Sequence, residues 1–192
     1  MQWKQRTHAP LARLEFGLLK QHRTLWAQRD LLWTRRLHQA SNYRVLVLLL
    51  ALVSRLGNGV LWYASMGVLP LVAGAQGWAC SLRMMLLGLV NLTIYWLLKR
   101  WAGRPRPFVA CQDIRACTRA LDQFSFPSGH TLHAVAFSTV LLQYFPALAF
   151  VLLPFTLLIA LSRVVLGLHY PSDVLAGAAI GALMAVGVLM LF

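Results

Sequence analysis

Six long apolar runs, separated by short polar segments, constrain the fold more than any other feature of the sequence. A helix needs about 20 residues to cross the hydrocarbon core of a bilayer, and about 17 can suffice. The runs therefore predict an all-α polytopic membrane protein, built as a bundle of six transmembrane helices, in which the first two spans are the shortest. The six predicted spans are approximately residues 42–56, 60–75, 78–98, 128–145, 147–165 and 173–192.

Positive charge concentrates beside these runs. The chain has 18 Lys and Arg residues against 5 Asp and Glu residues, which gives a net charge of +13. A basic protein can bind nucleic acid, but this sequence has no recognised nucleic-acid-binding motif, and bases that flank apolar runs are typical of contact with the phosphates of membrane lipids. We therefore expect membrane lipids, and not nucleic acid, as partners, and the sequence leaves protein partners open.

The N-terminal segment, residues 1–43, differs from the rest because it holds no continuous apolar run. Leu and Trp residues recur in it near helical spacing, with Arg and Lys between them. This pattern is typical of an amphipathic helix that lies in the headgroup layer of a membrane, and the alternative is a solvated basic tail. We accordingly predict two parts, a basic interfacial segment over 1–43 and a six-helix domain over 44–192.

The number of spans decides which polar segments share a face of the membrane. With six crossings, residues 99–127 and 166–172 lie on one face and residues 1–43 on the other. The positive-inside rule then predicts a cytoplasmic N-terminus, with the other two segments on the periplasmic or extracellular face of a bacterial inner membrane. Cys111 and Cys117 share the outer segment, where an oxidising space would permit a disulfide, and two free thiols are the equal alternative.

Three polar clusters fall on that predicted outer face. Their sequences are KRWAGRPRP at 99–107, FPSGH at 126–130 and SRVVLGLHYPSD at 162–173. A phosphate ester would account for them, because Lys and Arg clamp the charged oxygens of a phosphate and the amides at a helix start bind anions. We assign this phosphate clamp to Lys99, Arg106 and Arg163, with the anion-binding helix start at Pro127-Ser128-Gly129.

Two histidines and one aspartate supply the acid–base chemistry. His169 and Asp173 are four residues apart, so a helical turn places them on one face, and the carboxylate can hold one imidazole nitrogen protonated while the other acts as a nucleophile. His130 is the candidate proton donor to the leaving oxygen. Each cluster alone has a simpler explanation: an interfacial base such as Arg104 usually anchors a side chain at the membrane surface, and His133 is expected to be a packed histidine.

A metal centre is the alternative use of the histidines. His130, His133 and His169 could be imagined as ligands, but two-metal phosphatases need bridging acidic ligands, and this chain has 5 Asp and Glu residues in all. We therefore expect metal-independent chemistry without a cofactor.

The three clusters are similar to the three signatures of the type 2 phosphatidic acid phosphatase superfamily, to which vanadium haloperoxidases and glucose-6-phosphatase also belong. The matching patterns are Lys99-x6-Arg106-Pro107, Pro127-Ser128-Gly129-His130 and Ser162-Arg163-x5-His169-x3-Asp173. Arg104 does not end the first pattern, because the position seven before it is Leu97 and not lysine. The resemblance extends over roughly residues 45–190.

The resemblance implies a six-helix membrane domain with its site at the outer membrane surface. His169 would attack phosphorus to form a phosphohistidine, Asp173 would orient it, and His130 would protonate the leaving group and later activate water. The compact bacterial members dephosphorylate undecaprenyl diphosphate, phosphatidylglycerol phosphate or phosphatidic acid, of which we favour the first by analogy. A lipid phosphotransferase that uses the same phosphohistidine, and a non-catalytic protein that binds anionic lipid, are the alternative functions.

Overall fold

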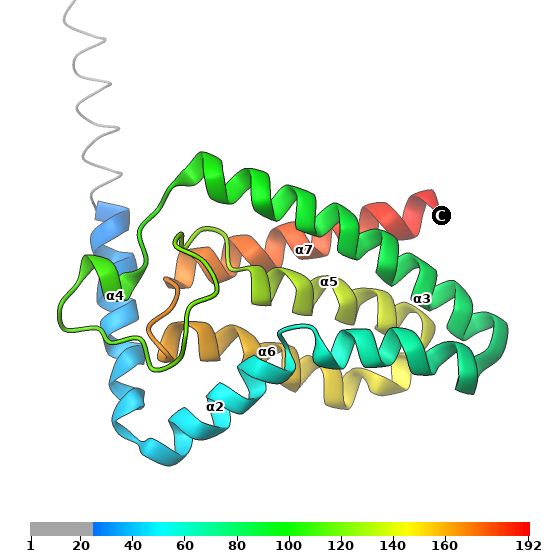
Figure 1. The fold of residues 1–192 in the computed structure, drawn as a ribbon, viewed down its shortest axis with the longest axis horizontal. Helices are drawn as coiled ribbons and strands as arrows, with labels where there is room; N and C mark the ends of the chain where they lie inside the picture. The colour runs from blue at the N-terminus through cyan, green and yellow to red at the C-terminus, as the bar shows by residue number, and fades with distance from the viewer. Residues whose placement is uncertain (1–24) are drawn as a thin grey trace, which may run out of the picture.

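The computed structural model describes residues 25–192. Within that range the chain forms a helical bundle with no β-strand, apart from one isolated bridge between Pro105 and Phe124 (Figure 1). The elements in chain order are a helix over 25–38, the 3-10 helix η1 (Gln39–Asn42), α2 (Arg44–Leu56), α3 (Val60–Ala102), α4 (Pro107–Ala110), α5 (Gly129–Tyr144), the 3-10 helix η2 (Pro146–Leu148), α6 (Ala149–Val165) and α7 (Pro171–Leu191).

The longest element, α3, consists of two antiparallel arms. Gly74 interrupts the helix with a φ of 52° and a ψ of −131°, and the positive φ favours glycine. The chain reverses direction there, at the end of the bundle opposite α4 (Figure 1). Gln76, just after the reversal, donates a 2.9 Å hydrogen bond to the carbonyl of Tyr144 at the end of α5, which places the bend at that end.

Helix α2 and the first arm of α3 run in the same direction and together cross the bundle once (Figure 1). His38, just before α2, lies 2.9 Å from the carbonyl of Val165 at the end of α6. Gly57, just after α2, lies against the side chain of Ile159 about halfway along α6. The turn over 57–59 therefore breaks this crossing near its middle without reversing it.

The described chain crosses the bundle five times, through 44–73, 75–102, α5, α6 and α7. The prediction of six transmembrane helices is therefore not confirmed for residues 25–192. The runs expected to span at 42–56 and 60–75 do form helices, but each is too short to cross a bilayer comfortably alone, and the two join end to end.

This count changes the position of the N-terminal segment. Residues 25–43 lie at the same end of the bundle as the loop 103–128 and the turn 166–170 (Figure 1). The prediction that the N-terminal segment lies on the opposite face is wrong for these residues, because an odd number of crossings follows them. Residues 1–24 of the predicted segment lie outside the described range.

The helix over 25–38 runs across the end of the bundle, roughly perpendicular to the crossings (Figure 1). Thr34 and His38 on one side of it are buried, whereas the rings of Trp26 and Trp33 on the other side are exposed. Exposed aromatic rings on a helix that lies flat on the bundle end are what an interfacial helix would present to lipid headgroups.

Helix α5 lies at the centre of the bundle, packed against α3, α6 and α7. Leu132, Phe137 and Val140 of α5 are buried, whereas large apolar side chains such as Leu71 and Phe150 are exposed on the outside. An apolar exterior around a packed helical core is the arrangement that a bilayer requires, and the protein is an integral membrane protein. The helices long and apolar enough to cross a membrane are Val60–Ala102, Pro146–Val165 and Pro171–Leu191 among the described residues.

Candidate active site

Three buried cations meet at the end of the bundle that also holds residues 25–43. Lys99 comes from the last turn of α3, Arg106 from the residue before α4, and Arg163 from the last turn of α6. Their exposed fractions are 5%, 1% and 3%. Lys99 Nζ lies 2.5 Å and Arg106 Nη2 lies 2.9 Å from the same carboxylate oxygen, Asp122 Oδ1. We call these four side chains the cation cluster.

Asp122 is the part of this cluster that sequence reasoning missed. Its carboxylate also accepts a 2.6 Å hydrogen bond from the Tyr95 hydroxyl and a 3.1 Å bond from the backbone N–H of Phe124. Burial alone would raise the pKa of this carboxyl, but the hydrogen bonds from Lys99 and Tyr95 outweigh it and lower the pKa to about 2. The signal in the sequence was one of the two aspartates, Asp113 and Asp122, between the first two polar clusters of an acid-poor chain.

The cation cluster has a hydrogen-bond donor that no described protein group accepts. Arg163 donates a 2.5 Å hydrogen bond to Ser54 Oγ, but its Nε has no hydrogen-bond partner among the described residues. One carboxylate also cannot neutralise three cations. Buried cations in excess over their counter-charges are suited to receive an anion with several oxygens, such as a phosphate.

His169 lies in the turn between α6 and α7, against the cation cluster. Its backbone N–H bonds to the carbonyl of Arg163 at 3.0 Å, and its Nε2 lies 3.3 Å from Arg106 Nη1. Because a guanidinium can only donate, Nε2 is the unprotonated nitrogen and Nδ1 carries the proton. Burial, and then the charges of Arg163 and Arg106, lower the pKa of His169 well below its usual value, so the ring is neutral and its lone pair is available.

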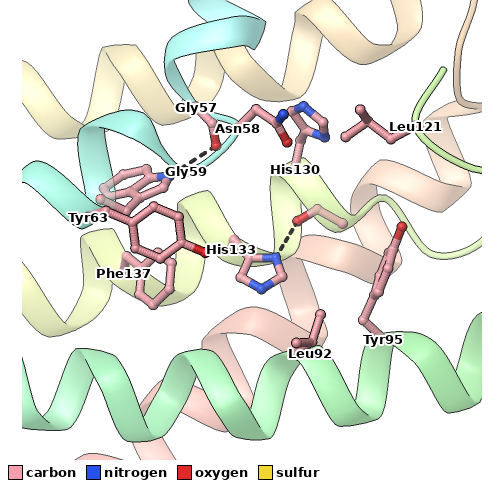
Figure 2. Close-up of a pocket in the computed structure, with 12 residues that line it drawn as sticks. Gly57, Asn58, Gly59, Tyr63, Leu92, Tyr95, Leu121, His130, His133 and Phe137 are labelled. Atoms are coloured by element: carbon pink, nitrogen blue, oxygen red, sulfur yellow. Dashed lines mark hydrogen bonds between the residues drawn. The ribbon is translucent and has the colours of Figure 1, made fainter. Parts of the chain in front are cut away.

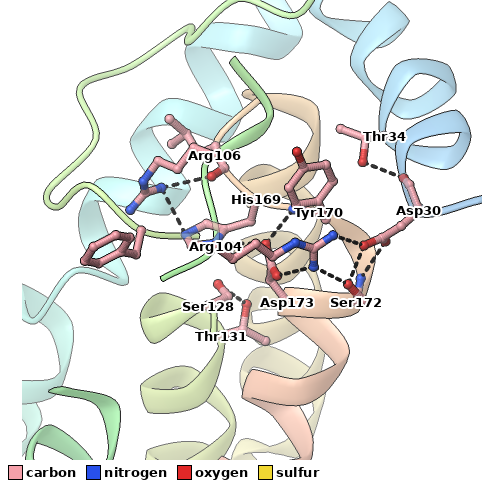
Figure 3. Close-up of polar contacts among 12 residues, drawn as sticks. Asp30, Thr34, Arg104, Arg106, Ser128, Thr131, His169, Tyr170, Ser172 and Asp173 are labelled. Carbon is pink, nitrogen blue, oxygen red and sulfur yellow. Dashed lines mark hydrogen bonds and ion pairs between the residues drawn. The ribbon is translucent and has the colours of Figure 1, made fainter. Parts of the chain in front are cut away.

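Asp173 stands behind His169 in the first turn of α7 (Figure 3). Its side chain is fully buried, and its Oδ2 accepts a 2.9 Å hydrogen bond from the backbone N–H of Tyr170. The same Oδ2 lies 3.7 Å from His169 Nδ1, which makes no hydrogen bond within the described residues. Such contacts are often long in an empty site and tighten when substrate binds.

The start of α5 links the second polar cluster to the third. The backbone N–H of Ser128 donates a 3.0 Å hydrogen bond to the carbonyl of Asp173, and its hydroxyl lies 3.0 Å from Thr131 Oγ1. Gly129 is required here because the ring of Tyr95 lies so close that a Cβ would come within 2.5 Å of it. The glycine therefore lets α3 and α5 approach each other beside the cation cluster.

His130 faces two hollows at this end of the bundle. It shares a cavity of about 710 Å³ with Arg163, Ser54 and the loop residues 118, 119 and 121. It also lines a smaller cavity of about 200 Å³, together with the turn 57–59 and aromatic side chains (Figure 2). The imidazole of His130 is thus in contact with open space on the same side as the cation cluster.

Comparison with known proteins identifies the family. The sequence profile of the PAP2 superfamily matches residues 77–192. The chain belongs to the PAP2 superfamily. It is 40% identical over 88 residues to undecaprenyl-diphosphatase BcrC of Bacillus subtilis, an alignment that covers 46% of this chain and 45% of the relative. The chain thus spans about half the length of the curated relatives that it matches.

Two solved structures resemble the whole fold. A transmembrane PAP2-type phosphatidylglycerolphosphate phosphatase from Bacillus subtilis superposes with a TM-score of 0.72 at 22% identity, covering 96% of both chains. LpxE of Aquifex aeolicus superposes with a TM-score of 0.67 at 26% identity, covering 83% of this chain and 94% of that one. The first likeness, at this identity, concerns the fold alone.

The PAP2 signature residues come together at one end of the bundle. Lys99, Arg106, Ser128, His169 and Asp173 are linked there through the contacts described above. Gly129 adjoins them at the start of α5, and Arg163 joins through the backbone of His169 and shares a cavity with His130.

Three further expectations about this region have different outcomes. His133 is a packed histidine, as expected: its Nδ1 lies 2.9 Å from the carbonyl of Gly129, as Figure 2 shows. Cys111 and Cys117 are both free thiols, so the disulfide is not formed. The interpretation of Arg104 as a surface anchor is wrong, because its guanidinium is bound to carboxylates inside the protein.

No group of three or more His, Cys, Asp or Glu side chains is placed to hold a metal ion among residues 25–192.

Proposed function

We propose that this PAP2 protein is a membrane phosphatase that hydrolyses a lipid-linked phosphate or diphosphate through a phosphohistidine on His169, with residues 44–192 as the catalytic domain. The observation that carries the proposal is the position of His169. Its unprotonated Nε2 faces Arg106, which is buried together with Lys99 and Arg163. The carboxylate that pairs with Lys99 and Arg106 is Asp122, and it is partly exposed. A neutral imidazole beside buried cations that exceed their counter-charge is suited to attack the phosphorus of a bound phosphate.

The proposed reaction has two steps. In the first, His169 Nε2 forms a bond to phosphorus while the bond to the leaving oxygen breaks, and His130 gives its proton to that oxygen. In the second, His130 takes a proton from water, the water oxygen attacks phosphorus, and the P–N bond breaks to release phosphate and His169. Asp173 stabilises the positive charge that the His169 ring gains. Lys99, Arg106, Arg163, Ser128 and the amide of Gly129 hold the phosphoryl oxygens.

Undecaprenyl diphosphate is the substrate that we favour. The similarity to undecaprenyl-diphosphatase BcrC supports it, and the exposed apolar surface around the bundle suits a substrate that stays in the membrane. Phosphatidylglycerol phosphate and phosphatidic acid carry the same phosphate chemistry and are included in the test for that reason.

Phosphate release by the purified protein tests the proposal. Each of the three lipids is supplied in detergent micelles, without an acceptor alcohol, to the wild-type protein and to His169→Ala. We expect inorganic phosphate from the wild type, no turnover above background from the variant, and no loss of activity in EDTA. Full activity of His169→Ala would reject the nucleophile. Release only when an acceptor is added would indicate a phosphotransferase, and loss in EDTA that a divalent ion restores would indicate a metal mechanism.

We also propose that the site end faces away from the cytoplasm, in the bacterial inner membrane. The family resemblance supports this side. The positive-inside rule does not support it, because that prediction placed the N-terminal segment on the face opposite the site. Cys111 and Cys117 lie at the site end and are partly exposed, whereas Cys80 is buried. A membrane-impermeant maleimide should therefore label the protein in intact spheroplasts, and labelling only after lysis would place the site in the cytoplasm. Cys111→Ser/Cys117→Ser, which should not be labelled, is the control.

A further inference from the structure

Arg104 lies outside the family patterns, yet its guanidinium contacts the carboxylate of Asp173, the partner of His169 (Figure 3). Arg104 Nη1 is 2.7 Å from Asp173 Oδ1, and the guanidinium carbon lies 3.9 Å from the centre of the Tyr170 ring. Burial alone would lower the pKa of Arg104, but the carboxylates of Asp173 and Asp30 raise it above its usual value. Arg104 is thus a fixed positive charge on the far side of Asp173 from the histidine.

The N-terminal helix holds Arg104 from the other side. Asp30 Oδ2 accepts a 2.6 Å hydrogen bond from Arg104 Nη2, and Asp30 Oδ1 accepts a 3.0 Å bond from the backbone N–H of Ser172. The Ser172 hydroxyl bonds to both Asp30 and Arg104. We call Asp30, Arg104 and Asp173 the carboxylate cluster. It fastens the 25–38 helix to the start of α7, where Asp173 lies.

This arrangement decides which way the Asp173 carboxylate faces. Arg104 binds Oδ1, and the N–H of Tyr170 binds Oδ2. Oδ2 is also the oxygen that lies nearest to His169 Nδ1, at 3.7 Å. Without Arg104, the carboxylate would keep one of its two fixed partners and could rotate about its bond to Cβ. The imidazole would then lose the oriented negative charge that stabilises it when it becomes positive.

We propose that Arg104 and Asp30 are a positioning pair for the reaction: Asp30 on the N-terminal helix holds Arg104, and Arg104 holds Asp173 in the orientation that serves His169. The inference rests on the proposed function. It makes the 25–38 helix, which lies outside the matched signatures, part of the catalytic geometry. Neither residue touches the phosphate cradle, so their loss should affect the chemical step and spare phosphate binding.

The test measures kcat, KM and the inhibition constant for inorganic phosphate. The probe is whichever of undecaprenyl diphosphate, phosphatidylglycerol phosphate and phosphatidic acid the wild-type protein hydrolyses fastest. Arg104→Gln should lower kcat about 10- to 100-fold, with KM and phosphate inhibition changed less than about twofold. Arg104→Lys should recover part of the loss, because it restores the charge without the two-pronged geometry. Asp30→Asn should lower kcat about 3- to 10-fold.

A double variant shows whether Asp30 acts through Arg104. If it does, Asp30→Asn/Arg104→Gln will be no slower than Arg104→Gln alone, since residues that act in series are not additive. A double variant whose loss is the product of the single losses would overturn the pairing. Loss confined to KM, or an unchanged kcat in both single variants, would overturn the positioning role.

The chain offers a matched control for a merely structural effect. Arg35 and Asp113 form a second ion pair, at 2.7 Å, between the same helix and the loop before the site, and both side chains are about half exposed. Asp113→Asn should leave kcat within about twofold, because exposed ion pairs contribute little. A loss equal to that of Asp30→Asn would overturn the inference. If Arg104→Gln does not fold, Arg104→Lys and Asp30→Asn decide by the same measurements. An inactive wild type would instead refute the proposed function.

Discussion

The two charged clusters at the site end use the same kinds of side chain in opposite proportions. The cation cluster has three cations and one carboxylate, Asp122, which is partly exposed and forms ion pairs with Lys99 and Arg106. The carboxylate cluster has two carboxylates around one cation, Arg104, and the Asp173 side chain at its inner end is fully buried. His169 lies between them, with Nε2 towards the first and Nδ1 towards the second.

The difference indicates that the cation cluster binds a ligand, whereas the carboxylate cluster holds two elements of the protein together. An excess of buried cations is costly until an anion arrives, so the cation cluster is suited to a ligand. The carboxylate cluster has its hydrogen bonds satisfied by protein groups and leaves nothing for a phosphate to bind. The charge difference across the imidazole ring also suits a nucleophile that faces an anion on one side and gains positive charge itself.

The largest expected effect on kcat/KM follows from the loss of Arg106, whose guanidinium contacts both His169 and Asp122. Arg106→Gln should lower kcat/KM by about 100- to 1000-fold, because the phosphoryl oxygens lose a charged two-pronged donor in a buried site. Steady-state phosphate release measures this. Arg106→Lys keeps the charge and should lose less. If the glutamine variant were as active as the wild type, the cation cluster would not be the phosphate cradle.

A smaller effect should follow from removing the carboxylate within the cation cluster. Phosphate and Asp122 compete for Lys99 and Arg106, so Asp122→Asn should bind inorganic phosphate about 3- to 10-fold more tightly, because a like charge near the ligand is removed. The variant should also melt at a lower temperature, since buried cations lose their counter-charge. Inhibition by phosphate and thermal melting in detergent measure the two effects. Weaker phosphate binding would show that Asp122 organises the cations for the ligand.

The smallest expected effect is a loss of folding stability as the pH falls. The pKa of His169 lies well below 6.5 in the folded protein, so below about pH 6.5 the unfolded chain binds a proton that the folded protein does not. Stability linked to this ring is complete above that pH and falls by about 1.4 kcal/mol per pH unit below it. Asp122 responds later, because its stabilising charge is lost only as pH falls from about 3.8 towards 2.

Melting temperatures between pH 7.5 and pH 5 check this difference. The wild-type midpoint should fall over that range, and His169→Asn, which removes the titrating ring, should show a flatter profile. Identical slopes for the two proteins would mean that His169 does not titrate differently on folding.

The sequence predicted the helices and the convergence of the signatures because both depend on local patterns. Apolar runs of the required length gave α5, α6 and α7 within a few residues, and the spacing of His169 and Asp173 placed them on adjoining turns. The ionic partners could not be found this way. Asp122 lies 23 residues from Lys99, and Asp30 lies 74 residues from Arg104. Only the packed bundle brings such residues together.

The additional crossing that the sequence predicted has a similar cause. Gly57-Asn58-Gly59 has the composition of a reversing turn, and separate spans at 42–56 and 60–75 would require the chain to reverse there. In the structure Gly57 keeps a φ of −69° and a ψ of −8°, close to helical values, and the chain continues onward. Composition predicts that a helix ends at such a turn, whereas the direction of the next helix depends on what it packs against.

The interrupted crossing at 57–59 has a consequence for solvent. Irregular backbone at membrane depth is tolerated where it lines a cavity, because lipid offers its N–H and C=O groups no partners. Residues 57–59 line the small cavity that ends on His130. The break therefore gives that cavity a polar backbone wall next to His130, where the proposed hydrolysis would need a water molecule.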